Sequence, residues 1–317
     1  MAKDTDRLYV CRWCFRYSCD VDAYVKHTRL CDNRTAPPGT KVYEHGGYSV
    51  WEVDGEEHKL FAQNLSLFAK LFLDHKSVFF DVASFLFYLL TFSDPSSPHD
   101  QDSHILGYFS KEKMSWDANN LACILVFPPY QHKQLGKLLM GVSYRLSGWD
   151  SDGGLIGSPE RPLSEMGWKS YSRFWRERVV RYLLLGSHRG DPEAERGRRE
   201  ALPSTTTSSG SSKKRNRVEN MTVQDMGLAV GMLTEDVITT LKGMGVVEPD
   251  RPRKKRKVPH HLSPEAIAGI EQEGQTVKLR KSNVVQLAKE NRITLLDPVR
   301  EEGFLGKWAS QRSDEET

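Results

Sequence analysis

Apolar residues gather in short runs along the first 185 residues, and the most prominent run spans residues 121–127. Its length is typical of a strand that is buried on both faces. Pro128 and Pro129 follow, and proline ends a strand because it lacks the N–H that a sheet ladder needs. A polar loop at 131–137 then leads into an amphipathic pattern, which predicts a helix over about 136–147.

A strand that ends in a loop before a helix can hold an anion. The free backbone N–H groups at the start of the helix and the positive end of the helix dipole point the same way. The order of elements therefore favours a pyrophosphate site at residues 131–137. Many strand–helix units have the same outline, so this pattern by itself also fits an ordinary buried strand and its crossover.

Periodicity predicts further elements on both sides of this segment. Alternating apolar and polar residues at 42–60 predict two or three antiparallel strands, because turn residues interrupt the alternation twice. Apolar runs predict strands at 78–80, 85–92 and 105–110, and helical spacing predicts helices at 64–73, 167–185 and 282–290. We expect Asn64 to be the N-cap of the first of these helices, and residues 304–308 to fold back onto the core.

Two short helices are predicted near the C-terminal end of the pattern. The first begins after Thr222 and the second covers 234–244, and each has a threonine, Thr222 or Thr234, as its expected cap. Two short helices joined by a turn form a helix-turn-helix-like unit.

Composition changes sharply after residue 185. The 317 residues, 38% of them hydrophobic, suffice for one large catalytic domain or two smaller ones. Residues 186–220 carry Arg, Glu, Ser, Thr and Gly with almost no large apolar residue, which predicts a disordered insert. The net charge of +3 is small, but residues 251–258 form a dense basic run that favours a nuclear import signal over an ordinary solvated charge run.

The N-terminus is polar, and no signal peptide is expected. The most apolar stretch, 82–92, is shorter than the roughly 20 residues that a membrane-spanning helix needs. The sequence therefore predicts a soluble intracellular protein without a membrane partner.

The first 31 residues contain four of the five cysteines of the chain. The ligand pattern Cys-x2-Cys-x12-His-x3-Cys suits tetrahedral Zn2+ and is formed by Cys11, Cys14, His27 and Cys31. Four ligands leave no open position, so the metal should be structural, and Cys19 breaks the spacing and should be a bystander. A role for the finger in contacting nucleic acid remains an open alternative. Lys26 and Arg29 are the few side chains of its helix that suit base contacts, so a finger docked on the next domain is favoured.

One central segment and five further ordered blocks of this chain resemble the MYST family of histone acetyltransferases. Segment 123–137, which reads Cys-Ile-Leu, then Pro-Pro-Tyr-Gln, then Gly-Lys, resembles the family's acetyl-CoA-binding segment. The finger with its Pro-Pro-Gly turn resembles the family's zinc finger, and blocks 63–76, 107–113, 157–164 and 221–245 also look like family blocks. The short layout, without an N-terminal chromodomain, PHD or bromodomain-type reader, resembles the fungal "something about silencing" branch.

The resemblance implies an α/β (α+β) fold, with a GNAT-like acetyltransferase core between an N-terminal zinc finger and a C-terminal helix-turn-helix-like segment. It divides the chain into a C2HC zinc finger at 1–36, an acetyl-CoA-binding core at 37–185, the insert at 186–220 and the C-terminal segment at 221–317. It also implies transfer of acetyl from acetyl-CoA to a lysine of a histone tail, with histone H4 expected, in the nucleus. Family members act on nucleosomes with accessory subunits of a multiprotein complex, and whether the helix-turn-helix contacts DNA stays open.

The resemblance also gives roles to single residues. Glu160 matches the family's general base, Cys123 the cysteine beside the acetyl group, and Lys76 the lysine that becomes autoacetylated. Cofactor contacts are expected from Ile124, Leu125, Val126, Gln131, His132, Lys133, Gln134, Leu135, Gly136, Lys137 and Ser164.

Acetyl transfer needs these residue types. A substrate lysine has a pKa of about 10.4, so a carboxylate must take its proton as the amine attacks. Backbone N–H groups must stabilise the developing oxyanion. Cys123 is either a nucleophile that forms an acetyl-enzyme or a small residue that lines the pocket, and direct transfer in a ternary complex is favoured. Without the resemblance, Glu160 would be interpreted as a carboxylate at the start of a helix.

The cofactor loop departs from the family pattern at one position. Gln134 stands where relatives have the first glycine of Gly-x-Gly, and glycine there permits a positive φ and a close approach to phosphate. We therefore expect weaker acetyl-CoA binding than in relatives, offset in part by charge at His132 and Lys133. Arg173 also replaces a serine near the cofactor. A non-catalytic chromatin scaffold remains the alternative, whereas one finger and a small net charge argue against a sequence-specific DNA binder.

Overall fold

The computed structural model describes residues 6–73, 79–94, 96, 103–115, 117, 119–149, 157–186, 218–246 and 276–309. They belong to two compact units, which are described separately below. The first comprises Met1–Leu155, Pro159–Leu163 and Asp297–Thr317, and the second comprises Ile156–Ser158 and Ser164–Leu296. Lys76, most of the predicted insert and the basic run 251–258 lie outside the described residues. Among the described helices, none combines the length and apolar character that crossing a bilayer requires.

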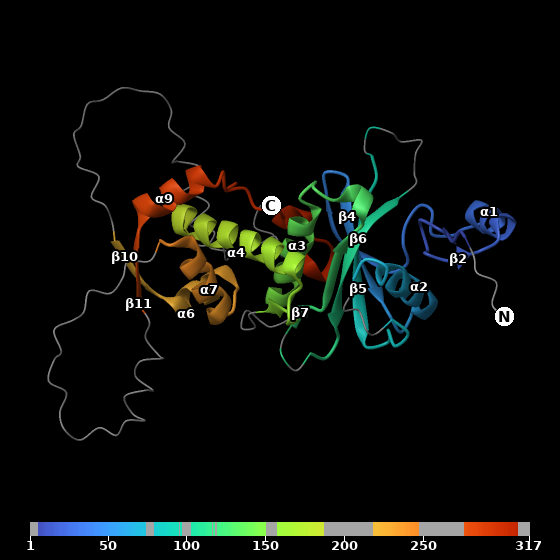
Figure 1. The fold of residues 1–317 in the computed structure, drawn as a ribbon, viewed down its shortest axis with the longest axis horizontal. Coiled ribbons are helices and arrows are strands. Elements are labelled where there is room, and N and C mark those ends of the chain that lie inside the picture. Colours follow the sequence, from blue (N-terminus) through green and yellow to red (C-terminus); the bar gives the residue numbers. More distant parts are fainter. Residues whose placement is uncertain are drawn as a thin grey trace, which may run out of the picture. The chain divides into compact units, whose positions relative to one another are not determined.

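A central antiparallel sheet organises the first unit (Figure 1). Its five strands, in spatial order, are β3 (Thr40–His45), β4 (Tyr48–Asp54), β5 (Phe85–Phe92), β6 (His104–Glu112) and β8 (Cys123–Val126). Each neighbouring pair is antiparallel, and Tyr108 of β6 lies opposite Leu125 of β8. The predicted mixed α/β fold is therefore confirmed.

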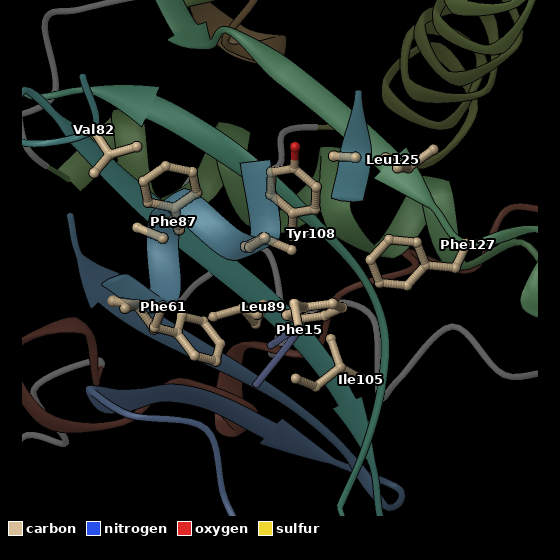
Figure 2. Packing of buried hydrophobic residues seen from close by; sticks show 13 residues of the cluster. Phe15, Phe61, Val82, Phe87, Leu89, Ile105, Tyr108, Leu125 and Phe127 are labelled. Carbon is tan, nitrogen blue, oxygen red and sulfur yellow. The ribbon is translucent and has the colours of Figure 1, made fainter. Parts of the chain in front are cut away.

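Helices cover the two faces of this sheet. Figure 1 shows α2 (Lys59–Ala69) on one face and α3 (Leu135–Trp149) on the other. Because successive strand residues point to opposite faces, Phe87 and Leu89 lie in the core on the α2 side, together with Tyr108 (Figure 2). The adjacent Tyr88 points the other way and stacks on Phe109, with ring centroids 4.5 Å apart.

The C-terminal end of the first unit folds back onto the sheet, as the sequence predicted for residues 304–308. Two 3-10 turns, η2 (Glu301–Gly303) and η3 (Gly306–Trp308), flank Phe304, whose ring contacts Tyr43 at a centroid distance of 5.1 Å. The Leu305 N–H donates to the Val42 carbonyl at 3.0 Å, so this tail pairs with the outer edge of β3.

The second unit is mainly helical. It contains α4 (Glu165–Leu185), α6 (Val223–Val230), α7 (Thr234–Met244) and α9 (Lys281–Glu290), with β10 (Val218–Thr222) paired antiparallel to β11 (Thr276–Arg280). The Thr222 side chain accepts from the Asp225 N–H at 3.0 Å, which confirms the predicted cap of α6. Gly231 and Gly245 end α6 and α7 in the left-handed conformation, which glycine adopts without strain.

Several predicted boundaries are wrong. The helix expected from Asn64 begins at Lys59, with His58 as its N-cap, because the short polar stretch at 63–64 simply faces outward on a helix that buries Phe61 and Leu65. Thr234 is the first residue of α7 and Leu233 precedes it as N-cap. In the predicted strand 78–80, residues 79–80 form a bend, and residue 78 lies outside the described part of the chain. The strands β10 and β11 were not predicted, and β10 begins at Val218, inside the insert predicted at 186–220, because its pairing with β11 is a long-range contact.

The apolar run 121–127 is not one strand buried on both faces. It is divided at Ala122 into β7 (Asn119–Leu121) and β8, and β8 is an edge strand with three half-buried residues. The division arises because the Ala122 N–H donates to the Ser110 carbonyl at 2.7 Å, after which β8 joins the sheet and β7 does not. The edge position leaves Cys123 and its neighbours partly exposed.

Candidate functional site

The N-terminal finger brings its four predicted ligands together. The ligand atoms of Cys11, Cys14, His27 and Cys31 all lie within 4.8 Å of one another. Cys11 Sγ is 3.9 Å from Cys31 Sγ, and Cys14 Sγ is 3.1 Å from His27 Nε2. Bonds of about 2.3 Å to a tetrahedral Zn2+ would place sulfur ligands about 3.8 Å apart, so the cluster fits this metal. Cys19 is exposed and outside the cluster.

Local structure explains this convergence. Strands β1 (Tyr9–Val10) and β2 (Tyr17–Ser18) pair around the turn that carries the first two cysteines. Asp20 then caps α1 (Val21–Arg29) by accepting the N–H groups of residues 22 and 23. The last turn of α1 carries His27, and the chain beyond the helix returns Cys31 to the same point.

The thiols of the finger cannot all ionise independently. A hydrogen bond from the Cys14 thiol lowers the pKa of Cys11 to about 4, and the same contact raises the pKa of Cys14. Burial raises the pKa of Cys31. Three thiolates this close repel one another unless a cation lies between them, so the chemistry of the donor set also fits a divalent metal with no open position.

The finger is docked on the sheet core. Phe15, directly after the first pair of ligands, is buried and contacts Phe61, Phe68 and Phe127, with ring centroids 5.5–6.0 Å apart. Figure 2 shows Phe15 among Leu89, Ile105 and Phe127. The interpretation of the finger as a docked structural element agrees with this packing.

The second candidate region runs from β8 to the start of α3. After β8, a 3-10 turn, η1 (Pro128–Tyr130), reverses the chain, and the Gln131 side-chain amide donates back to the Val126 carbonyl at 2.9 Å. This bond holds the exposed loop 131–134 at the end of β8. Ile124, Leu125 and Val126 thus lie in the strand that precedes η1 and this loop.

Two residues of this loop have a left-handed backbone. Gln134 has φ = 61° and His132 has φ = 64°. A positive φ was expected to be required at 134, and Gln134 adopts it, so the loop keeps the shape that glycine would give it. His132 was not expected to do so. Both side chains are exposed, as is Lys133, and the strain amounts to about 1–2 kcal/mol for each such residue.

The start of α3 is open to an anion. The first N–H groups of an α-helix lack intrahelical partners and carry the positive end of the dipole. A Cβ atom added at Gly136 would meet nothing within 4 Å, so space remains beside this helix terminus. Leu135 is buried and anchors the turn. The Lys137 ammonium donates to Gln134 Oε1 at 3.2 Å, which places a cation at the same loop.

Cys123 and Glu160 are brought to adjoining strands, β8 and β7. Cys123 is half-buried in β8, opposite Ser110. The Glu160 N–H donates to the carbonyl of Leu121 at 2.9 Å, two residues before Cys123. The Glu160 side chain is exposed. The structure therefore brings the backbone of Glu160 to the segment 121–134, which also carries the Cys123 thiol and the candidate phosphate loop.

Two further predicted residues lie in the second unit. Ser164 is the N-cap of α4, and its Oγ accepts from the Gly167 N–H at 3.1 Å. Arg173 pairs with Glu177, from Nε to Oε1, at 3.2 Å. Both side chains thus have structural partners within their own helix.

The model of the MOZ/SAS family matches residues 36–287, which is most of the chain.

The chain belongs to the MOZ/SAS family.

Curated relatives carry acetyltransferase names. "Histone acetyltransferase MOF" of Drosophila melanogaster is 40% identical over 241 residues, which cover 76% of this chain and 24% of the relative. "Histone acetyltransferase Tip60 homolog" of Caenorhabditis elegans is 38% identical over 237 residues, 75% of this chain and 44% of the relative. "Histone acetyltransferase of the MYST family 2" of Arabidopsis thaliana is 36% identical over 245 residues, 77% and 46% of the two chains. The chain thus spans less than half the length of these relatives.

Within this MOZ/SAS chain, sequence reasoning missed one residue beside Cys123. The Tyr108 hydroxyl is fully buried and has no hydrogen-bond partner in the described part of the chain. Burial raises the pKa of Tyr108 well above its ordinary value, and the charge of Cys123 adds to this shift. The sequence marked Tyr108 only through its place in the block 107–113. It follows Gly107, where an added Cβ atom would lie 2.4 Å from the Leu125 carbonyl oxygen.

Proposed function

We propose that the chain is a histone lysine N-acetyltransferase, which transfers the acetyl group of acetyl-CoA to a lysine of a histone tail. The observation that carries this proposal is the single segment that joins Cys123, the loop 131–134 and the start of α3, with Glu160 bonded to it through Leu121. Membership of the MOZ/SAS family supports it. The names of the relatives favour a histone substrate, and a histone H4 tail is the acceptor that we propose to test first.

Acetyl-CoA fits the segment in two places. The pyrophosphate would lie at the N-terminus of α3, against the amides of residues 135 and 136 and near the cations Lys133 and Lys137. The pantetheine arm would run along the outer edge of β8, against backbone groups of Ile124 and the N–H of Val126, because the Val126 carbonyl already accepts from Gln131. Bound there, acetyl-CoA supplies an activated thioester beside Cys123.

The residues of the chain would then act on the acceptor lysine. The Glu160 carboxylate would take a proton from the lysine ammonium, because only the neutral amine is a nucleophile. As the new N–C bond forms, the C–S bond breaks, and the nitrogen loses its second proton to the departing thiolate, so that CoA leaves as the thiol. Backbone N–H groups near Cys123 would stabilise the developing oxyanion. In this direct transfer Cys123 lines the pocket and forms no acetyl-enzyme.

The alternative, a non-catalytic scaffold, rested on Gln134. The structure favours the enzyme, because Gln134 adopts the left-handed backbone of the glycine that it replaces. The loop therefore keeps its shape, and the space beside Gly136 remains open.

The finer assignments extend this proposal. The finger would hold one structural Zn2+. A histone substrate implies action in the nucleus, on nucleosomes and with accessory subunits. DNA contact by α7 has little support, because its first turn is acidic, with Glu235 and Asp236, whereas DNA binding relies on cations. Autoacetylation of Lys76, the import role of 251–258, the four-part domain division and the silencing branch stay predictions.

The test uses Glu160→Gln and a matched control, Glu165→Gln. Glu165 is also exposed, in the first turn of α4, and pairs only locally with Lys169 at 2.7 Å. We expect the parent chain and both variants to bind acetyl-CoA equally in calorimetry. Transfer to a histone H4 peptide should fall about 10²–10⁴-fold in Glu160→Gln and stay unchanged in Glu165→Gln. Absence of acetyl-CoA binding by the zinc-loaded parent would instead support the scaffold.

A further inference from the structure

Asp236 is a fully buried carboxylate in the second unit. It occupies the third position of α7, and its Oδ2 accepts a hydrogen bond from the Ser158 hydroxyl at 2.8 Å. Ser158 is itself 3% exposed. The bond therefore joins two side chains that are 78 residues apart in the sequence and are both shielded from water.

A bond of this kind fixes its partners firmly. A carboxylate without water is unfavourable unless hydrogen bonds and a positive dipole compensate it. The N-terminus of α7 supplies the dipole, and a hydroxyl that donates to a charged oxygen makes a stronger bond than one between neutral groups. Loss of either side chain would leave the other polar group buried without this partner, so the bond strongly restrains the backbone at Ser158.

Ser158 lies two residues before Glu160. The residue between them is Pro159, whose ring fixes its own φ near −65°. The Glu160 N–H is then held by the Leu121 carbonyl at 2.9 Å. Asp236 and Ser158 belong to the second unit, and Glu160 and Leu121 to the first, so the link between the two bonds is the covalent chain itself.

The Glu160 side chain is exposed. The point from which it reaches outward is set by how its backbone is held. A catalytic group must keep its position within about 1 Å, since a misplacement of that size can lower a rate about 10²-fold. The Ser158–Asp236 hydrogen bond before Pro159 and the Glu160–Leu121 hydrogen bond after it supply that restraint.

We propose that Asp236 is a positioning residue for Glu160 and acts through Ser158. This inference rests on the proposed function, in which Glu160 is the general base. It gives the helix-turn-helix-like segment a task in acetyl transfer that is independent of DNA.

The first experiment compares Asp236→Asn, Ser158→Ala and the double variant with a matched control, Asp225→Asn. Asp225 occupies the same third position of the neighbouring helix α6, but it is exposed and bonds Thr222 instead. For the full chain and a histone H4 peptide, we expect kcat to fall at least tenfold in Asp236→Asn and Ser158→Ala, with the Kd for acetyl-CoA changed less than twofold. The double variant should be no slower than the slower single variant, because both residues act through one bond.

Rescue separates positioning from general folding. Ser158→Thr keeps the hydroxyl and should retain a kcat within about threefold of the parent, whereas Ser158→Ala should not. Equal losses in Asp225→Asn, or additive losses in the double variant, would overturn the proposal.

The second experiment does not depend on activity. Hydrogen exchange at the Glu160 amide reports directly on its bond to Leu121, and we expect exchange at least tenfold faster in Asp236→Asn and Ser158→Ala, with amides of α4 unchanged. Unaltered exchange at Glu160 would refute the link between Asp236 and Glu160 even if transfer is observed. Faster exchange in a parent chain that transfers no acetyl group would uphold the link and refute the proposed function instead.

Discussion

Replacing Gln134 tests how the cofactor loop works. The sequence suggested that glutamine at this position weakens acetyl-CoA binding through its backbone. In the structure, however, Gln134 has φ = 61°, the backbone that glycine would adopt there. We expect the loop to keep this backbone when acetyl-CoA binds, so the strain of about 1–2 kcal/mol is borne when the chain folds and cancels between the free and the bound loop.

The Gln134 side chain is therefore the part of this residue that can change the affinity for acetyl-CoA. Gln134 Oε1 accepts from the Lys137 ammonium at 3.2 Å, at the terminus where phosphate would bind. An exposed bond of this kind contributes about 0.5–1 kcal/mol. Removing it makes Lys137 more available to phosphate, and the same energy corresponds to a roughly 2–5-fold tighter Kd.

Two variants separate the contributions of backbone and side chain. Gln134→Gly removes both the strain and the amide, whereas Gln134→Ala removes the amide and keeps the strain. We expect both variants to bind acetyl-CoA about 2–5-fold more tightly in calorimetry. Only Gln134→Gly should also gain stability, by no more than about 1 kcal/mol, because the added freedom of the unfolded chain offsets about 0.4–1 kcal/mol of the relieved strain. Tighter binding by the glycine variant alone, or by neither, would refute this reasoning.

Three further outcomes are expected. Cys14→Ala should abolish binding of one Zn2+ per chain, measured by atomic emission, and should lower the Tm by about 10 °C, because the finger no longer holds Phe15 in the core. Cys123→Ala should retain turnover within about tenfold in a steady-state assay, since direct transfer does not need the thiol; complete loss with intact acetyl-CoA binding would indicate an acetyl-enzyme. Burial alone would raise the pKa of Asp54, but the Lys113 ammonium, at 2.7 Å, and a backbone N–H lower it overall. The ionised Asp54 therefore stabilises the fold above the unfolded pKa of about 3.9, and this stabilisation is lost as the pH falls further. Between pH 5 and 3, the Tm of Lys113→Met should fall less than the Tm of the parent. Equal falls in Tm would contradict this role of the Asp54–Lys113 pair.

Local patterns in the sequence determined much of the fold. The spacing of the first two cysteines, His27 and Cys31 specified a four-ligand site, because a turn and a helix place ligands at fixed intervals. The apolar runs at 85–92 and 105–110 specified β5 and β6, since a long run has few alternatives in a buried sheet. Thr222 marked the start of α6, because its capping bond goes to a near neighbour, the Asp225 N–H.

Tertiary structure decided what depends on distant partners. The division of 121–127 follows from the bond of Ala122 to Ser110, and the earlier start of α2 follows from the core that Phe61 enters. The sequence placed Glu160 and Cys123 37 residues apart and named them by resemblance; only the fold joins them, through Leu121.

The same limit applies to the buried bond between Ser158 and Asp236. A helix start with an acidic residue gives no sign that its carboxylate is buried, because burial is set by the elements that pack around it. The sequence by itself therefore determined the ligands, the cap of α6 and the main strands, each of which is fixed by near neighbours. The tertiary structure alone decided which of these residues meet, because long-range contacts depend on the packing of the whole chain.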